Sequence, residues 1–236
     1  MMDLNADIGE GSDDASLMPY LTRVSIACGG HAGDAASMKA ALRLAAEYGV
    51  AVGAHPGYPD RAHFGRRALV AAPDEIRAWV MQQTEALAGV AARLGLRLAH
   101  VKPHGALYTM AASDAEVAAA IAGAVTALDN RLALIGLSGS CLVEAARAAG
   151  LQPLAEAFAD RRYRPDGQLV SRETPGALIT DPAQAAAQAR RLARGEAIAA
   201  QDGSPLLIAA DTLCLHSDTP GAQIIAQAVH AALNRG

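Results

Sequence analysis

Three ionisable side chains that can bind a metal or move a proton follow the first three apolar segments of the sequence. Asp7 lies in DLNADIGEG, His31 in IACGGHAGD and His55 in GAHPGYPD. A carboxylate with two neutral imidazoles suits a catalytic divalent metal. The same groups can transfer protons without a metal, with the carboxylate orienting an imidazole. A lone histidine is typically a hydrogen-bonded structural residue, but three such groups after successive segments favour a catalytic site. No HxxxH or HExxH spacing links His31 or His55 to another histidine, so both chemistries stay open.

A lysine and another histidine follow the next apolar segment, in VKPHGALY. Lys102 is one of only two lysines in the chain, and Pro103 disfavours helical backbone at Lys102. The ammonium group is therefore expected to project from a strand end, where it can stabilise an oxyanion or hold a phosphate or carboxylate. His104 is expected to exchange protons with the same substrate. The alternative for Lys102 is a solvated loop position.

Further polar residues of the same segments are predicted to contact the substrate. Arg66 and Arg67 in HFGRR, with Arg162 in ADRRY, can bind a carboxylate or phosphate through paired hydrogen bonds. A surface role for each arginine, and a helix N-cap role for Asp218, are the alternatives. The predicted substrate contacts are Asn5, Glu10, Asp34, Arg67, Asp160, Arg162, His216 and Asp218. Structural roles are expected for His63, His100 and His230.

Alternating strand-like and helix-like segments are expected to position these residues. Apolar runs that end at Gly, Pro or a charged residue predict strands, and helical periodicity after a capping residue predicts helices. The predicted strands are 2–8, 24–28, 50–54, 96–101, 132–137, 153–158 and an interrupted strand made of 206–209 and 213–216. The predicted helices are 34–49, 73–94, 113–128 with a capping box of Ser113 and Glu116, 138–150, 181–194 and one from about 220. Residues 167–179 are predicted to form a hairpin or an extended excursion.

The alternation predicts an α/β fold with a parallel sheet and helical crossovers. About seven strands in 236 residues fit a single domain, 1–236, folded as a closed barrel of seven or eight strands. The C-terminal ends of the strands of such a barrel converge on one site. An open doubly wound sheet is the alternative.

Composition narrows the classes of function. The net charge of −4 gives no electrostatic reason to expect nucleic acid or a membrane surface as a partner. No uncharged apolar run is long enough to cross a bilayer, and no signal peptide is recognisable, so a cytoplasmic location is expected. Cys28, Cys141 and Cys214 lie in apolar runs and are expected to be buried free thiols. The chain has no Walker loop, no GxSxG elbow and no complete GxGxxG.

Seven segments together resemble the LamB/YcsF family, the A-subunit family of prokaryotic 5-oxoprolinase. They are DLNADIGEG, IACGGHAGD, GAHPGYPD with FGRR, VKPHGALY, FADRRY, GQLVSRETPGA and HSDTPGA, and they span nearly the whole chain. The resemblance implies a distorted seven-stranded (β/α) TIM-like barrel of the glycoside hydrolase/deacetylase type. Departures from the family pattern occur at Ser25, His63, Thr109 and Ser217. Ser217 replaces a typical Gly between His216 and Asp218 and restricts the backbone there.

The resemblance also implies ATP-dependent opening of 5-oxoproline (pyroglutamate) to L-glutamate by a complex with subunits B and C. ATP is then a cofactor at the level of the complex. Family motif positions imply that Asp7, with His31 or His55, activates water directly or through a divalent metal. Lys102 would neutralise an oxyanion or phosphate, and His104 would protonate the ring nitrogen. Arg67 or Arg162 would hold the substrate carboxylate. A stand-alone metal-dependent amidase or deacetylase and a non-catalytic binding subunit remain as alternatives.

Overall fold

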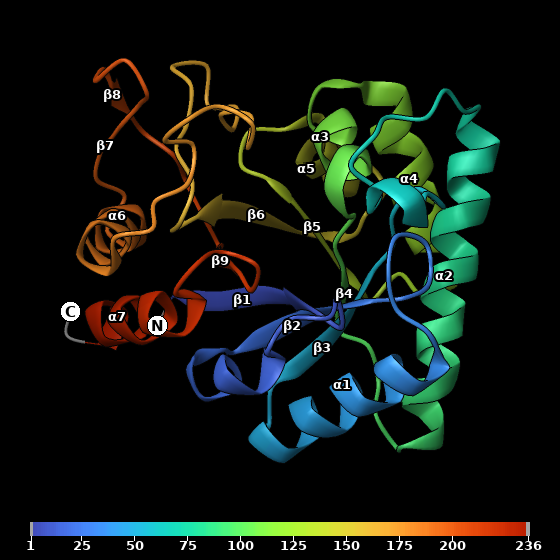
Figure 1. Ribbon diagram of the computed structural model, residues 1–236. Coiled ribbons are helices and arrows are strands. Elements are labelled where there is room, and N and C mark those ends of the chain that lie inside the picture. Colours follow the sequence, from blue (N-terminus) through green and yellow to red (C-terminus); the bar gives the residue numbers. More distant parts are fainter. Residues whose placement is uncertain (1, 235–236) are drawn as a thin grey trace.

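A closed barrel of seven parallel strands forms the centre of the computed structural model, which describes residues 2–234 (Figure 1). The strands, in barrel order, are β1 (Asp3–Ile8), β2 (Arg23–Ala27), β3 (Ala51–His55), β4 (His100–Val101), β5 (Ala133–Leu137), β6 (Gln152–Phe158) and β9 (Thr212–His216). β9 pairs in parallel with both β1 and β6 and closes the barrel. The predicted barrel of seven strands is confirmed, and the alternative of an open doubly wound sheet is wrong.

Helices cover the outside of the barrel. They are α1 (Ala35–Tyr48), α2 (Pro73–Arg93), α3 (Gly105–Ser113), α4 (Ala115–Leu128), α5 (Cys141–Ala148), α6 (Pro182–Ala193) and α7 (Ala222–Asn234). Three short 3-10 helices are η1 (Asp14–Ser16), η2 (Met18–Tyr20) and η3 (Arg61–His63). α6 and α7 pack side by side, on the opposite side of the molecule from α2 (Figure 1).

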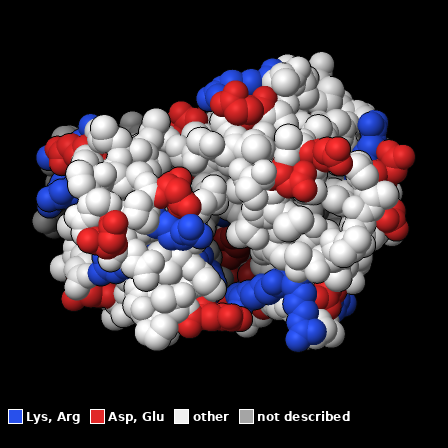
Figure 2. Space-filling view, turned by 90° about the horizontal axis from the view of Figure 1, so that it is seen from above, with Lys and Arg blue, Asp and Glu red and all other residues white. Residues whose placement is uncertain are grey.

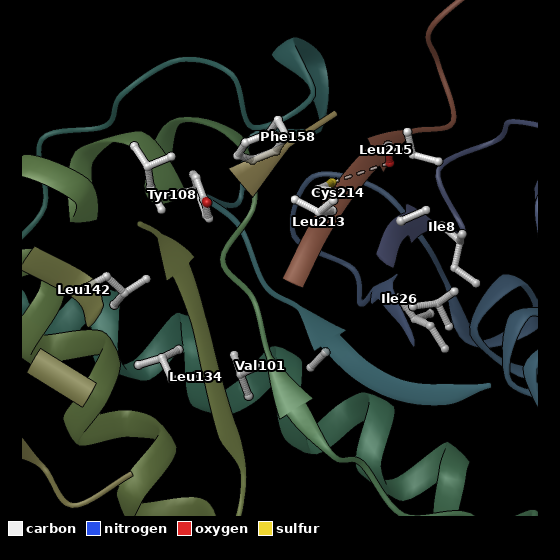
Figure 3. Close-up of a cluster of buried hydrophobic side chains, with 14 of the residues drawn as sticks. Ile8, Ile26, Val101, Tyr108, Leu134, Leu142, Phe158, Leu213, Cys214 and Leu215 are labelled. Carbon is white, nitrogen blue, oxygen red and sulfur yellow. Dashed lines mark hydrogen bonds between the residues drawn. The ribbon is translucent and has the colours of Figure 1, made fainter. Parts of the chain in front are cut away.

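The inside of the barrel is polar, whereas the apolar core lies mainly between strands and helices. In β1, Leu4, Ala6 and Ile8 belong to the hydrophobic core, and the intervening Asn5 side chain bonds across the barrel to Glu156 and Thr212. Figure 3 shows the apolar side chains Ile8, Ile26, Leu134 and Leu213 among the strands and the surrounding helices. This pattern places polar side chains on the inner face of the strands, where they can support a site.

Several predicted elements need correction. α3 is absent from the predicted helices, and it ends where the Ser113 capping box was expected; the Asp114 carboxylate caps α4 instead by accepting from the Glu116 and Val117 amides. Predicted strand 96–101 is reduced to the two residues of β4. The predicted interrupted strand is wrong, because β8 (Pro205–Leu206) pairs antiparallel with β7 (Ile198–Ala199) outside the barrel.

Residues 159–181 form an extended excursion that follows β6. Isolated bridges join Arg161 to Leu178 and Tyr163 to Leu169, so the predicted excursion is confirmed without a regular hairpin. Asp181 then caps α6 by accepting from the Gln184 amide. The excursion brings arginines from residues 161–172 to the rim of the barrel.

The three cysteines are free, as predicted. Cys28 and Cys214 are buried, and Cys141 is half-buried. Burial raises the pKa of the Cys28 thiol to about 12, which keeps it protonated. No single helix of residues 2–234 has the length and apolar character of a membrane span; α3 and α4 pass by length and composition only as a pair bent by 116°.

Candidate active site

A cavity of about 640 Å³ opens at the C-terminal ends of the strands. Seven of the predicted site residues line it, namely Asp7, Glu10, His55, Lys102, His104, His216 and Asp218. They come from segments up to about 200 positions apart and meet because the strands are parallel and the barrel is closed. Figure 2 shows a hollow in the surface with acidic side chains inside it and basic side chains at its edge. A cavity of this size accommodates a small organic ligand.

Predicted residues outside the cavity lining have other roles in the structure. Asp34 caps α1 by accepting from the Ala36 and Ser37 amides, and it is exposed. Arg162 donates to the Gln184 side chain. Arg67 is exposed, and the neighbouring Arg66 lines the cavity in its place. The predicted substrate contacts of these residues are therefore corrected.

His55 and His104 face each other through ring nitrogens that each carry a lone pair when the imidazoles are neutral. His55 Nδ1 lies 2.7 Å from the Lys102 carbonyl oxygen, and His104 Nε2 lies 2.9 Å from the Phe64 carbonyl oxygen. Carbonyl oxygens only accept, so these nitrogens carry the protons. The remaining atoms, His55 Nε2 and His104 Nδ1, are 3.0 Å apart. A contact of this length between two acceptors requires a proton or a metal cation between them.

Glu10 adds negative charge to the same point. Its Oε1 lies 3.2 Å from His104 Nδ1, 3.7 Å from His55 Nε2 and 2.8 Å from His31 Nε2. Burial alone would raise the pKa of Glu10, but its contacts with His104 and His31 lower it strongly, so the group is a carboxylate. Burial lowers the pKa of His55 to about 3, which disfavours a second proton, on Nε2, beside the one on Nδ1. Both effects favour a metal cation over a proton at this point.

The donor set fits a divalent metal. Potential ligand atoms of Glu10, His31, His55 and His104 all lie within 4.8 Å of one another. The backbone carbonyls that orient His55 and His104 are partners typical of metal-binding histidines. The His31 ring stacks on that of His104 at 3.5 Å, and its Nδ1 is buried without a partner among the described residues. The predicted set of Asp7, His31 and His55 therefore changes, since Glu10 and His104 join it.

Asp7 lies next to this cluster instead of inside it. One carboxylate oxygen is 3.4 Å from His55 Nε2, and the other is 3.1 Å from Lys102 Nζ. Burial would raise the pKa of Asp7, but its electrostatic interactions with His55 and Lys102 outweigh burial and the pKa is lowered. Asp7 is thus an anionic group between the cluster and the ammonium.

Lys102 is a buried ammonium on the floor of the cavity. Its Nζ lies 2.8 Å from Glu156 Oε1 and 3.3 Å from Asn5 Oδ1, and Tyr108 donates to the other Glu156 oxygen at 2.8 Å. Burial would lower the pKa of Lys102, but the Asp7 and Glu156 carboxylates help to raise it well above its usual value. Lys102 therefore stays charged. Asn5 lies beneath the cavity and positions Lys102, so its predicted contact with substrate is corrected.

A histidine–aspartate pair lies on the other wall. His216 Nδ1 is 2.9 Å from Asp160 Oδ1, and Asp160 also accepts from the His216 amide and the Thr219 hydroxyl. The His216 ring stacks on Phe158. Among the described residues His216 Nε2 has no partner, and His216 lines the cavity. Asp160 is fully buried and acts through His216, which corrects its predicted contact with substrate.

Asp218 joins two rim arginines. It accepts from Arg66 Nη2 at 2.7 Å and from Arg172 Nη1 at 2.9 Å. α7 begins four residues later at Ala222, so the alternative N-cap role of Asp218 is wrong. The replacement of Gly by Ser at 217 is accommodated, because Ser217 has an ordinary backbone and its hydroxyl donates to the Asp7 carbonyl.

The backbone of the FGRR segment is shaped around the histidines. Phe64 is the only non-glycine among the described residues with positive φ, at 54°. This costly conformation directs its carbonyl to His104, and its ring packs edge-on against His31 and His104. Gly65 has φ of 61°, and a Cβ there would lie 2.8 Å from His31 Cβ. Only glycine therefore fits this approach.

The structure adds residues that the sequence did not single out. Glu156, Tyr108, Phe64, Arg161 and Arg172 contact or line the site. Glu156 carries a weak signal, since it is a charged residue inside an apolar strand. The predicted structural roles of three histidines are consistent with their contacts: His100 bonds to Ser25, His63 to Asp60, and His230 packs on Tyr20.

Known proteins resemble the chain over nearly its full length. The LamB/YcsF family matches residues 2–236. The 5-oxoprolinase A-subunit of Methylococcus capsulatus is 52% identical over 96% of this chain and 89% of that protein. The one from Chloroflexus aggregans is 50% identical over 98% of this chain and 94% of that protein.

Solved structures agree with this relationship. The lactam utilization protein from Thermus thermophilus superimposes with a TM-score of 0.93 at 45% identity, covering 99% of this chain and 96% of that chain. A putative cellobiose-phosphate cleavage protein from Enterococcus faecalis shares the fold alone, with a TM-score of 0.52 at 11% identity over 99% and 93% of the two chains. The family match and the identity to full-length relatives show that the chain belongs to the LamB/YcsF family.

Proposed function

We propose that this chain is the hydrolytic subunit of an ATP-dependent 5-oxoprolinase, which opens the lactam of 5-oxoproline to L-glutamate. The observation that carries the proposal is the meeting of a carboxylate, an ammonium and a buried histidine cluster in one cavity. The relatives are named as 5-oxoprolinase A-subunits, and these names are the basis for proposing 5-oxoproline as the substrate and a complex of several subunits. The partners proposed from the family resemblance are subunits B and C.

Chemical steps follow from the protonation states of the cavity residues. Asp7 is anionic and accepts a proton from the attacking water, whose oxygen bonds to the lactam carbonyl carbon. Lys102 is cationic and stabilises the negative charge at the carbonyl oxygen, either of an oxyanion or of a phosphoryl group on that oxygen. His216 in its imidazolium form, with Nδ1–H donated to Asp160, gives its Nε2 proton to the ring nitrogen as the C–N bond breaks. The products are the amine and carboxylate of glutamate.

His104 is a poor proton donor for the leaving nitrogen. Its Nε2 donates to the Phe64 carbonyl, and its Nδ1 faces His55 and Glu10. Both nitrogens are therefore engaged inside the cluster. This geometry moves the proposed acid role from His104 to His216.

Glu10, His55 and His104, with His31 beside them, are the proposed ligands of a divalent metal. A bound cation would polarise the lactam carbonyl and lower the pKa of water. Purified protein, with its metal content measured by elemental analysis, is expected to hold about one metal per chain, and Glu10→Gln is expected to lose it. Glu173→Gln, a change at an exposed cavity residue, is the matched control. An equal metal content in Glu10→Gln and the parent protein would remove Glu10 from the site.

ATP is proposed to act in the complex by phosphorylating the amide oxygen of the lactam. Transfer of the γ-phosphoryl group to that oxygen releases ADP, and attack of water with cleavage of the C–N bond then leaves an acyl phosphate. A second water hydrolyses the acyl phosphate and releases phosphate. Because this sequence contains no Walker loop, ATP binding is proposed to lie with the partners.

Reconstitution tests the proposal. The chain is mixed with subunits B and C, ATP and 5-oxoproline, and glutamate and phosphate are measured while each component is omitted in turn. Glutamate is expected only from the complete mixture. Glutamate formation without this chain would overturn the proposal.

The histidine cluster specifically supports one alternative, a metal-dependent amidase that acts without ATP. The same omission series distinguishes the two, because an amidase continues to open the lactam when ATP and the partners are left out. Metal stripping and re-addition would then control its activity.

A further inference from the structure

The cations that line the cavity differ in whether a carboxylate neutralises them. Lys102 is paired with Asp7 and Glu156. Arg66 and Arg172 share Asp218, and Arg164 lies 3.0 Å from Asp166. Arg161 also lines the cavity, but none of the described carboxylates lies within ion-pair distance of it.

Arg161 is deeply buried despite its charge. The residue is only 5% exposed, whereas the rim arginine Arg66 has a side-chain exposure of 48%. Its Nη2 donates to the Val170 carbonyl at 2.6 Å, and its Nε is buried with no hydrogen-bond partner among the described residues. Burying a cation without a counter-charge is costly, and such groups are normally paired.

The surroundings of Arg161 increase that cost. Burial lowers its pKa, and the positive charge of nearby Arg172 lowers it further. Asp160, the preceding residue, is occupied by three hydrogen bonds to His216 and Thr219 and provides only partial compensation. An anion entering the cavity beside Arg161 would relieve this imbalance.

We propose that Arg161 receives the carboxylate of the substrate and selects lactams that carry one. A guanidinium group has several N–H donors in one plane. A carboxylate matches them with one negative charge and two acceptor oxygens. Asp160 positions His216 and Arg161 lines the same cavity, so adjacent residues would orient the proton donor and the substrate. This inference rests on the proposed function and names the residue that recognises its substrate class.

This assignment replaces Arg67 and Arg162, the two arginines expected from the sequence to hold the substrate carboxylate. Arg67 is exposed outside the cavity lining, and Arg162 bonds to Gln184 on α6. Arg162 is adjacent to Arg161 in sequence but points to a different partner. Arg162→Met is therefore a matched control for Arg161→Met, since both changes remove one positive charge and keep an unbranched side chain.

Binding of two ligands tests the inference. The full chain, alone and with its partners, is titrated calorimetrically with 5-oxoproline and with 2-pyrrolidinone, the same lactam without the carboxylate. The parent protein and Arg162→Met are expected to prefer 5-oxoproline by roughly 10- to 100-fold, the range typical of a charged hydrogen-bonded pair. Arg161→Met is expected to bind both ligands about equally. Arg161→Lys, which keeps the charge, is expected to recover part of the preference.

Each outcome has a defined meaning. A preference for 5-oxoproline that persists in Arg161→Met would overturn the inference. The inference would also be overturned if the parent protein, alone and with its partners, showed no detectable binding of 5-oxoproline. Circular dichroism checks the fold of each variant, and Arg161→Gln, which also removes the charge, replaces Arg161→Met if the latter does not fold. Arg161-dependent binding of 5-oxoproline without glutamate formation would instead overturn the proposed hydrolysis and leave the carboxylate site intact.

Discussion

Individual side chains in this site are defined by their partners more than by their own chemistry. His55 and His104 each donate one N–H to a backbone carbonyl, which turns their other nitrogens toward each other and toward Glu10. Lys102 is held charged by two carboxylates. A carbonyl or a carboxylate at the right place therefore decides whether a residue is a metal ligand, an acid or an electrostatic stabiliser.

Lys102→Met is expected to reduce glutamate formation by the reconstituted complex by about 10²- to 10³-fold, because it removes the charge that stabilises the oxyanion. Initial rates at saturating 5-oxoproline measure the effect. Lys39→Met, which changes the other lysine at an exposed position of α1, is expected to have no effect. Since Met leaves Asp7 and Glu156 without a counter-charge, the double variant Lys102→Met/Glu156→Gln separates lost catalysis from lost stability. Near-parental rates in folded protein would remove Lys102 from the mechanism.

His216→Asn is expected to lower kcat while KM for 5-oxoproline changes little, because the proton donor acts in the transition state. Asp160→Asn is expected to have a smaller effect of the same kind, since it disturbs the orientation of His216. The comparison is made with His63→Asn, a change at an exposed histidine outside the cavity. An unchanged kcat in His216→Asn would assign the proton to another group.

At the scale of elements, short loops after the strands place these side chains. α2 contributes Gln83, whose amide bonds both the amide and the carbonyl of Gly57 and fixes the loop after β3. η3 ends at His63 and is followed by Phe64 and Gly65, both in the left-handed conformation. The loop carbonyl that orients His104 depends on this turn.

Gly65→Ala is expected to reduce activity at least about tenfold, because the new methyl group would displace His31 and His104. Both the strain of a left-handed alanine, roughly 1–2 kcal/mol, and the clash reduce stability. Gly139→Ala has the same type of strain at φ of 73° but faces open space, so activity is expected to persist. Rates and urea unfolding of the two variants separate strain from clash. Equal activities would show that the close approach at Gly65 does not matter.

The whole molecule concentrates buried ionisable groups inside one barrel, and this links its stability to pH. His55 has a folded-state pKa of about 3, below its unfolded value of 6.5. The unfolded chain therefore takes up a proton on acidification before the folded chain does. The stability contributed by neutral His55 is present above pH 6.5 and is lost as the pH falls toward 3.

Urea unfolding of the metal-free protein is expected to show a loss of about 2 kcal/mol from His55 alone between about pH 7.5 and about pH 5. His55→Asn is expected to remove this part of the pH dependence, whereas His63→Asn, at an exposed position, is expected to keep it. An identical pH dependence in His55→Asn and the parent protein would contradict the low pKa of His55.

Local patterns in the sequence determined the fold class and most of the strand-end residues. Apolar runs that end at Gly, Pro or a charged group predict strands, and Asp7, His55 and Lys102 lie at or directly after the ends of such runs. The alternation of strands and helices then favours parallel pairing, which brings strand ends together. This reasoning needs only neighbours along the chain.

Tertiary structure alone decided which of these residues cooperate. Glu156 reaches Lys102 across the barrel, and the Phe64 carbonyl orients His104, contacts that depend on barrel closure and on one strained turn. The choice of Arg161 over Arg162 depends on which neighbour turns toward the cavity. Sequence periodicity cannot give these answers, because hydrogen-bond partners, burial and pKa shifts arise only when distant segments share the same space.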